Sequence, residues 1–229
     1  KDFEFAFGNY TSFKGNINMV GLPDIENTFI NLKTNAFYSS VADIESFTLP
    51  SADGNSHLVL PEAVRKLGNV SVNGRFTGFY NDFVSKATFI TDLGQVTTDI
   101  LLTNNKAAHN YEYDGKILVG SFNAGKLLDM PQLGTLDLYA IVKGKNFSLE
   151  RTDLTAKGEI TNLQYEGNTI GLINVDGDFR KKRFTGGVYV NDELLGLNFL
   201  GSADFSEELP AFDFQADITH ANLAKLDLM

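Results

Sequence analysis

The chain has 229 residues, a formal net charge of −10 at pH 7, and neither cysteine nor tryptophan. A nucleic-acid backbone or an anionic membrane surface would repel so acidic a chain, so neither is expected as its main partner. Without cysteine it has no disulfide framework and no thiolate metal site. It also has no apolar run of transmembrane length and no signal peptide. We therefore expect a segment of a larger extracytoplasmic bacterial protein.

Alternation of apolar and polar residues with a period of two recurs along the chain and predicts strands with one apolar face. Such strands form antiparallel sheet that is wetted on one side. Because few helices are expected, the sheet must fold onto itself as a closed barrel, a sandwich or a curled open trough. In chain order, the clearest runs are Val70–Phe76, Leu136–Val142, Leu154–Ile160, Val175–Phe179, Gly186–Val190, Leu195–Phe199 and Phe212–Ile218.

Short helical segments are expected between some of these strands. Residues 61–67 have proline at a first-turn position, Glu62 beside it and Gly68 as a stop. A second element occurs three times, at residues 42–47, 122–127 and 221–226. Each copy has Asp or Asn in second place, which suits the capping of a single turn.

The spacing of this repeated element indicates modules of about 80–100 residues. The predicted ranges are 1–60, 61–130 and 131–229, within one elongated β domain. The alternative is that the likeness between copies is convergent β-meander chemistry.

The sequence offers no cluster of groups suited to catalysis. His57, His109 and His220 have no metal-ligand spacing and are interpreted as surface residues. Residues 120–127 imitate a phosphate-binding loop but end in leucine where serine or threonine is required. We therefore expect no enzyme, no metal and no cofactor. The basic run 180–183 is interpreted as a solvated hairpin tip, with contact to a lipid headgroup or a partner as the alternative.

The apolar strand faces allow two interpretations. They pack against one another as a closed core, which periodicity alone favours, or they line an open surface for lipid. Strands of seven to nine residues make a sheet about 25 Å tall, enough to shelter acyl chains. At about 0.8 kcal/mol per buried CH₂, an acyl chain of roughly fourteen carbons gains on the order of 10 kcal/mol.

Several segments, in this order and spacing, resemble the TamB proteins of Bacteroidetes, which belong to the AsmA-like group. The segments are residues 21–25, 28–30, 60–83, 91–94, 122–128, 174–177 and 209–214. The resemblance covers nearly the whole chain, although no single motif is decisive. It implies an all-β fold: a long curled antiparallel sheet forming an open trough (a β-taco) with an apolar concave face and a few short helices.

The resemblance also implies a periplasmic location, with the full-length protein anchored in the inner membrane. It implies a role in phospholipid transport between the membranes and in outer-membrane protein assembly. An Omp85-family outer-membrane barrel is the implied partner, through parts of the protein outside this segment. No catalytic residue is implied.

With that resemblance we expect an open trough whose alternate strand positions contact phospholipid acyl chains. The alternative is a structural or adhesive β module with a closed core and no lipid site. The predicted contact residues are Val72, Phe76, Leu138, Val142, Ile160, Val175, Phe179, Val188, Val190, Leu197, Phe199, Phe212 and Phe214.

Overall fold

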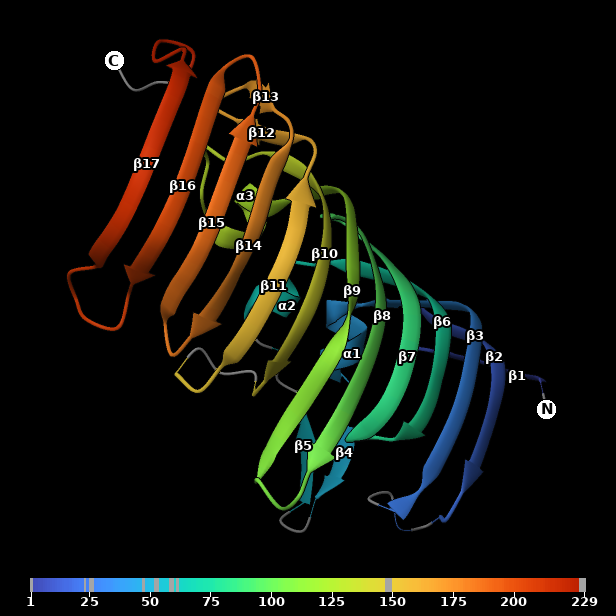
Figure 1. Cartoon of the computed structure of the whole chain (residues 1–229). Coiled ribbons are helices and arrows are strands. Elements are labelled where there is room, and N and C mark those ends of the chain that lie inside the picture. Colours follow the sequence, from blue (N-terminus) through green and yellow to red (C-terminus); the bar gives the residue numbers. More distant parts are fainter. Residues whose placement is uncertain are drawn as a thin grey trace.

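The chain folds into one antiparallel sheet of thirteen strands (Figure 1). The computed structural model describes residues 2–22, 24, 27–46, 48–51, 54–57, 60, 62–146 and 150–226. In spatial order, which is also chain order, the strands are β1 (Asp2–Phe7), β2 (Thr11–Val20), β3 (Phe29–Ser40), β6 (Asn69–Phe79), β7 (Asp82–Thr91), β8 (Gly94–Asn105), β9 (Asn110–Asn123), β10 (Thr135–Lys145), β11 (Asp153–Ile160), β14 (Ile173–Arg180), β15 (Arg183–Asn191), β16 (Leu195–Asp204) and β17 (Ala211–Ala221).

The remaining elements lie in the connections between these strands. They are the helices α1 (Val41–Ser46), α2 (Glu62–Arg65) and α3 (Ala124–Leu128), and two small hairpins, β4 (Thr48–Ser51) with β5 (Gly54–His57) and β12 (Leu163–Tyr165) with β13 (Asn168–Ile170). All of them leave the sheet at the same edge. We call that edge the insertion margin; its strand ends are residues 7/11, 40/69, 91/94, 123/135, 160/173, 191/195 and 221.

The opposite edge is simpler, and we call it the hairpin margin. Its strand ends are residues 20/29, 79/82, 105/110, 145/153, 180/183 and 204/211. In the described part of the chain, no helix or extra hairpin lies in these connections. Figure 1 shows the sheet bending around α1, α2 and α3, which lie on its inner side.

Strand register places the apolar positions on the inner face. Phe76 lies opposite Ser85, which lies opposite Ile100, and the row continues through Gly115 to Val142. Residues directly opposite in antiparallel strands share a face. The rows therefore fix one continuous inner face across the sheet.

A row of small residues crosses the inner face of the C-terminal half. Ala156, Gly177, Gly186 and Gly201 are directly opposite one another. A Cβ at Gly177 would lie 2.6 Å from the ring of Phe184, so that ring lies across the glycine. Small side chains on the inner side leave room for the sheet to bend inward there.

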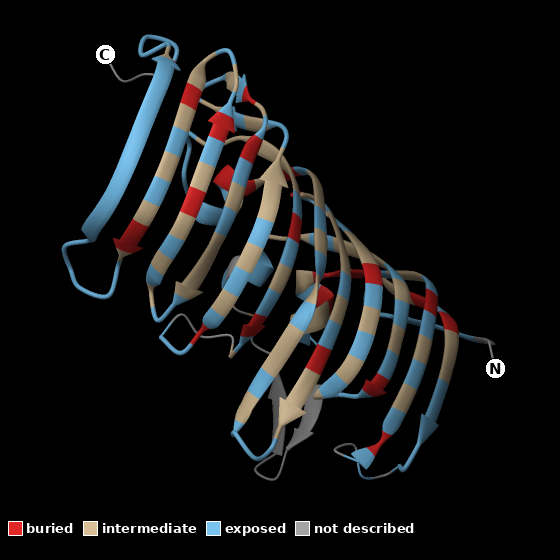
Figure 2. Ribbon diagram, in the orientation of Figure 1, coloured by how far each residue is buried: buried red, intermediate tan, exposed pale blue. Residues whose placement is uncertain are grey.

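Burial shows that the inner face is not the centre of a closed core. The accessible surface is 14688 Å², whereas a compact protein of 25.2 kDa exposes about 10,300 Å². Among the described residues, the only side chain less than 2% exposed is Thr28. Figure 2 shows alternating bands of exposure along most strands, and β17 exposed along nearly its whole length. The sheet is therefore an open, curled layer.

The predicted fold class is confirmed: the chain is almost all β, with an antiparallel sheet that does not close on itself and only short helices. The sheet also continues across both predicted module boundaries, because β6 pairs with β3 and β10 pairs with β9.

The three copies of the repeated element all lie at the insertion margin, but their capping differs. Asn123 and Asn222 accept hydrogen bonds from the amides three residues onward, as predicted. For Asp43 the prediction is wrong, because Ser40 caps that turn. The third copy is a turn and not a helix. Phe47 of the first copy and Pro61 of the predicted helix lie outside the described residues.

Candidate functional site

All thirteen predicted contact residues lie on the inner face. Eleven of them occupy four adjoining rows in the C-terminal half, and the other two, Val72 and Phe76, belong to the same face in β6. The rows, from the insertion margin to the hairpin margin, are Leu138–Ile160–Ile173–Val190–Leu197–Ile218, Val175–Val188–Phe199–Ala216, Val142–Ala156–Gly177–Gly186–Gly201–Phe214 and Phe179–Phe184–Ala203–Phe212.

The inner face carries no Asp, Glu, Lys or Arg at the register positions of the thirteen described strands. Many of its polar members are small, such as Thr34, Ser85 and Thr98, and the larger ones include Asn104, Tyr111 and Tyr113. A continuous uncharged surface costs little to bring against hydrocarbon.

Part of the inner face at the insertion margin is covered. Ile173 and Val190 form a buried cluster with Ile170 of β13 and with Leu226, which follows β17. The half-buried side chains of Ile160, Leu163, Tyr165, Val175, Val188, Leu194, Leu195 and Leu197 pack against this cluster. Among the predicted contact residues, Val190 is therefore a core residue, and Ile160, Val175, Val188 and Leu197 flank the core.

The rest of the inner face is more open. Phe76 and Phe179 are half-buried, and Phe212 and Phe214 are 59% and 54% exposed. Some rings pair along the face, with 4.7 Å between the centroids of Phe76 and Phe83 and 5.1 Å between those of Phe199 and Phe214. The aromatic and aliphatic side chains of this region lie outside the buried cluster beneath β12–β13.

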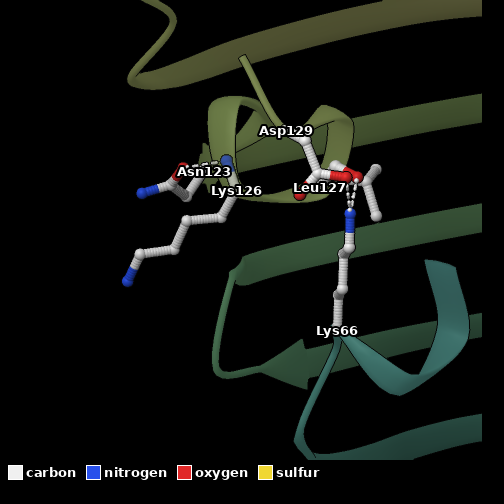
Figure 3. A network of polar contacts seen from close by, with 5 residues as sticks. All are labelled: Lys66, Asn123, Lys126, Leu127 and Asp129. Carbon is white, nitrogen blue, oxygen red and sulfur yellow. Dashed lines mark hydrogen bonds and ion pairs between the residues drawn. The ribbon is translucent and has the colours of Figure 1, made fainter. Parts of the chain in front are cut away.

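We call the connections that contain α1 and α2, α3, and β12–β13 the covering connections. Hydrogen bonds join them to one another along the insertion margin. Lys66, just after α2, donates to the carbonyl oxygen of Leu127 at 3.1 Å and forms an ion pair with Asp129 (Figure 3). Asn123 caps α3 by accepting from the amide of Lys126 at 2.8 Å, whereas the Lys126 side chain points away from these contacts. The phosphate-loop-like segment is thus part of a capped turn.

The same chain of contacts continues into the C-terminal half. The amide of Gly134 donates to the carbonyl oxygen of Gln164 at 2.8 Å, which attaches β12 to the α3 connection. Asn168 donates to the carbonyl oxygen of Lys225 at 2.7 Å, which attaches the hairpin to the turn holding Leu226. These contacts hold the β12–β13 hairpin and the turn with Leu226 in position over Ile173 and Val190.

The first covering connection is fastened by Asp43 in α1. Its carboxylate accepts hydrogen bonds from the amides of Asn9, Tyr10 and Thr11 at 3.2, 2.8 and 2.7 Å, and from the Thr11 hydroxyl at 2.9 Å. The Tyr10 amide contributes most to holding the pKa of Asp43 below its usual range, against the opposing effect of desolvation. Asp43 therefore anchors α1 to the β1–β2 turn.

A second carboxyl group with a lowered pKa, that of Asp137, lies near the start of β10. Hydrogen bonds from the Ser121 amide at 2.6 Å and from the Asn162 side chain at 2.6 Å hold the pKa of Asp137 below its usual range. Ser121 has a positive φ of 47°. This contact stabilises the irregular end of β9 and does not assemble a catalytic group.

The outer face carries cross-strand ion pairs and hydroxyl side chains. Lys157 and Asp176 are 3.1 Å apart, and Lys143 and Asp114 are 3.5 Å apart. The basic run 180–183 forms the tip of the β14–β15 hairpin, as predicted, and Lys181 and Lys182 have positive φ there. Charge is thus confined to the outer face and the margins.

Sequence reasoning missed an aromatic cluster at the N-terminal end of the inner face. Phe3, Phe5 and Phe13 have ring centroids 5.7–6.2 Å apart. Phe7 lies in the same alternation, because it faces Thr11 across β1 and β2. The Phe-x-Phe-x-Phe pattern of residues 3–7 was the signal that could have identified it.

Features of other kinds of site are few. His109 and His220 are exposed, and the side chain of His57 lies outside what the structure describes. No group of three or more His, Asp or Glu residues among the described positions is arranged to hold a metal. No described helix is long and apolar enough to cross a membrane. Comparison with protein-family models, curated proteins and solved structures finds no match to this chain.

Proposed function

We propose that the chain binds phospholipid acyl chains along the open part of its inner face. The observation that carries this proposal is an uncharged apolar face, running across thirteen strands, that the fold leaves only partly covered. Exposed apolar area of this extent is rare on monomeric soluble proteins and marks a surface for apolar ligands or partners.

The dimensions and energies suit this ligand. Thirteen strands at a spacing of about 4.8 Å make a sheet roughly 58 Å wide. An acyl chain of about fourteen carbons gains on the order of 10 kcal/mol from burial at about 0.8 kcal/mol per CH₂. Loss of translational and rotational freedom offsets several kcal/mol of that gain. The balance favours binding without any specific polar contact on the inner face.

The resemblance to Bacteroidetes TamB proteins supports a wider role. We propose that the chain is a periplasmic segment of an AsmA-like envelope protein that conducts lipid between the inner and outer membranes and supports outer-membrane protein assembly. Contact with an Omp85-family barrel belongs, in this proposal, to other parts of the protein. The open antiparallel trough is compatible with this role.

The alternative is a structural or adhesive β module without a lipid site. The buried cluster of Ile170, Ile173, Val190 and Leu226 favours it for the insertion margin, where the inner face serves as a core. It accounts less well for the half-buried and exposed phenylalanines elsewhere on that face.

The test is native mass spectrometry and organic extraction of the purified chain, with two matched double variants. Phe184→Asp with Phe199→Asp places two carboxylates on the inner face of the neighbouring strands β15 and β16, outside the buried cluster. Tyr189→Asp with Leu200→Asp places them on the outer face of the same strands, where both residues are exposed. Far-UV circular dichroism checks that each variant is folded.

Phospholipid on the parent and on the outer-face variant, with at least a tenfold loss on the folded inner-face variant, is the expected result. Equal lipid on all three proteins would place the lipid elsewhere. No lipid on the parent, also after incubation with vesicles, would return the inner face to a structural role.

A further inference from the structure

Three cations occupy directly opposite positions on neighbouring strands of the outer face. Register places Lys33 of β3 opposite Arg75 of β6, and Arg75 opposite Lys86 of β7. All three side chains are exposed. Like charges directly opposite each other destabilise a sheet. A chain with a net charge of −10 therefore concentrates positive charge in one row at a cost in stability.

Elsewhere on the outer face, opposite charges meet at such positions. Lys157 pairs with Asp176, and Lys86 itself reaches Asp99 on the next strand at 3.6 Å. Asp99 in turn lies opposite Lys116 of β9, so it has a cation on either side. Within the described residues, neither Lys33 nor Arg75 forms an ion pair or a side-chain hydrogen bond.

A second like-charge pair on this face shows how the sheet normally compensates. Arg180 lies opposite Arg183 across β14 and β15. Arg180 forms an ion pair with Asp153 at 3.1 Å, and Arg183 donates to the Ser202 hydroxyl at 3.1 Å. The fold supplies these two arginines with partners from their own sheet, whereas the row of Lys33 and Arg75 lacks them in the part of the chain described.

The three cations also line a hollow in the outer face together with neutral hydrogen-bonding groups. The polar residues that also line it include Asn73, Thr88 and Thr97. The hydroxyls of Thr88 and Thr97 are 3.0 Å apart and bond to each other, which leaves one hydroxyl hydrogen free to donate to a ligand. Cations and donors therefore converge on one shallow, exposed site.

We propose that Lys33, Arg75 and Lys86 form a binding site for a phosphate group. Adjacent strands are about 4.8 Å apart, so the row spans roughly 10 Å, and a phosphate at its centre contacts Arg75 and one or both lysines. The guanidinium of Arg75 presents two parallel N–H donors that match two phosphate oxygens. A bound dianion converts the repulsion within the row into attraction.

Two kinds of ligand carry such a phosphate group: a phosphorylated lipid headgroup and a free phosphate compound. The site is on the face opposite to the acyl-binding surface and shares no residue with it. A result that contradicts the phosphate site therefore does not contradict the acyl-binding proposal, and the reverse also holds.

The test uses thermal unfolding of the parent, Arg75→Gln and Lys157→Gln, each in inorganic phosphate and in sodium chloride of equal ionic strength. Lys157→Gln is the control because it also removes one outer-face cation, but one that is paired with Asp176. Phosphate stabilises folded proteins generally, so only the difference between variants is informative. Without phosphate, Arg75→Gln should be at least as stable as the parent, because it removes two like-charge contacts.

If the three cations bind phosphate, phosphate should raise the melting temperature of the parent and of Lys157→Gln by the same amount. The rise for Arg75→Gln should be at most half as large. Equal rises in all three proteins would overturn the proposal. Co-sedimentation with phosphatidylcholine vesicles, with and without phosphatidic acid, then identifies the source. Arg75-dependent sedimentation with phosphatidic acid assigns the site to a lipid headgroup; Arg75-dependent stabilisation by phosphate alone assigns it to a free phosphate compound.

Discussion

The inner face of β14 and β15 has different surroundings at its two ends. At the insertion margin, Ile173 and Val190 lie opposite each other and are each 8% exposed beneath the β12–β13 hairpin. At the hairpin margin, Phe179 and Phe184 lie opposite each other, half-buried and outside that buried cluster. The same alternating pattern thus produces a core at one end and an open surface at the other. What differs is the connection that folds back over the strands.

The largest expected effect is on the covered end. Ile173→Ala should lower the free energy of unfolding by about 2–5 kcal/mol, because it leaves a cavity beneath β12–β13. Ile100, which faces inward from β8 and is half-buried, receives the same substitution as the control. Its loss should be less than half as large in urea denaturation. Equal losses would mean that the two regions are packed alike.

The row of small residues between the two ends gives the next largest effect. A Cβ at Gly186 would lie 2.4 Å from the carbonyl oxygen of Asp176 and 2.5 Å from the Cα of Gly177. Gly186→Ala should therefore force β14 and β15 apart and cost about 1–3 kcal/mol. Gly120→Ala is the control, because nothing lies within 4 Å of its Cβ. If both variants unfold at the same urea concentration, the glycine row does not set the curvature.

The pH dependence of stability tests whether Asp43 anchors α1 to the β1–β2 turn. A lowered pKa in the folded state means that Asp43 stabilises the protein fully above the ordinary aspartate pKa of about 3.9. That stabilisation is lost as the pH falls further, through the lowered folded-state pKa. Asp43→Asn should lower the urea midpoint at pH 7, and its difference from the parent should shrink as the medium becomes more acid. A difference that is constant over this range would contradict the assignment.

The smallest effect is expected on the outer face. Lys157 and Asp176 are 73% and 56% exposed in their side chains, so solvent screens their attraction. Lys157→Gln should cost only about 0.2–1 kcal/mol, and less in high salt. A loss as large as that of Ile173→Ala would show that the outer face contributes to stability in a way that the inner-face comparison omits.

The alternation of apolar and polar residues was sufficient to predict an antiparallel all-β fold and the inward side of the strands, whereas the open form of the sheet was expected only from the family resemblance. Alternation alone assigned Phe76, Phe179 and Phe214 to the same face, because side chains in a strand change sides at every residue. The strand register follows, because a shift of one residue would move these apolar side chains to the other face of the sheet.

The distinction between covered and open regions could not be predicted in the same way. Val190 and Phe179 have equivalent patterns around them, and their different burial depends on where residues 161–172 and 222–226 fold back. Those contacts join segments far apart in the chain, as the bond from Asn168 to Lys225 illustrates. Asp43 was misassigned for the same reason, since its partners are more than thirty residues away.

The central claim is that acyl chains contact the open part of the inner face, and one labelling experiment tests it most directly. Because the chain has no cysteine, a single cysteine can carry a fluorescent bimane at Phe184→Cys on the inner face or at Thr185→Cys on the outer face of the same strand. Phospholipid with brominated acyl chains quenches the label on contact. The proposal predicts strong quenching at position 184 and little at position 185. Equal quenching at both positions, or none at 184 while lipid is bound, would contradict it.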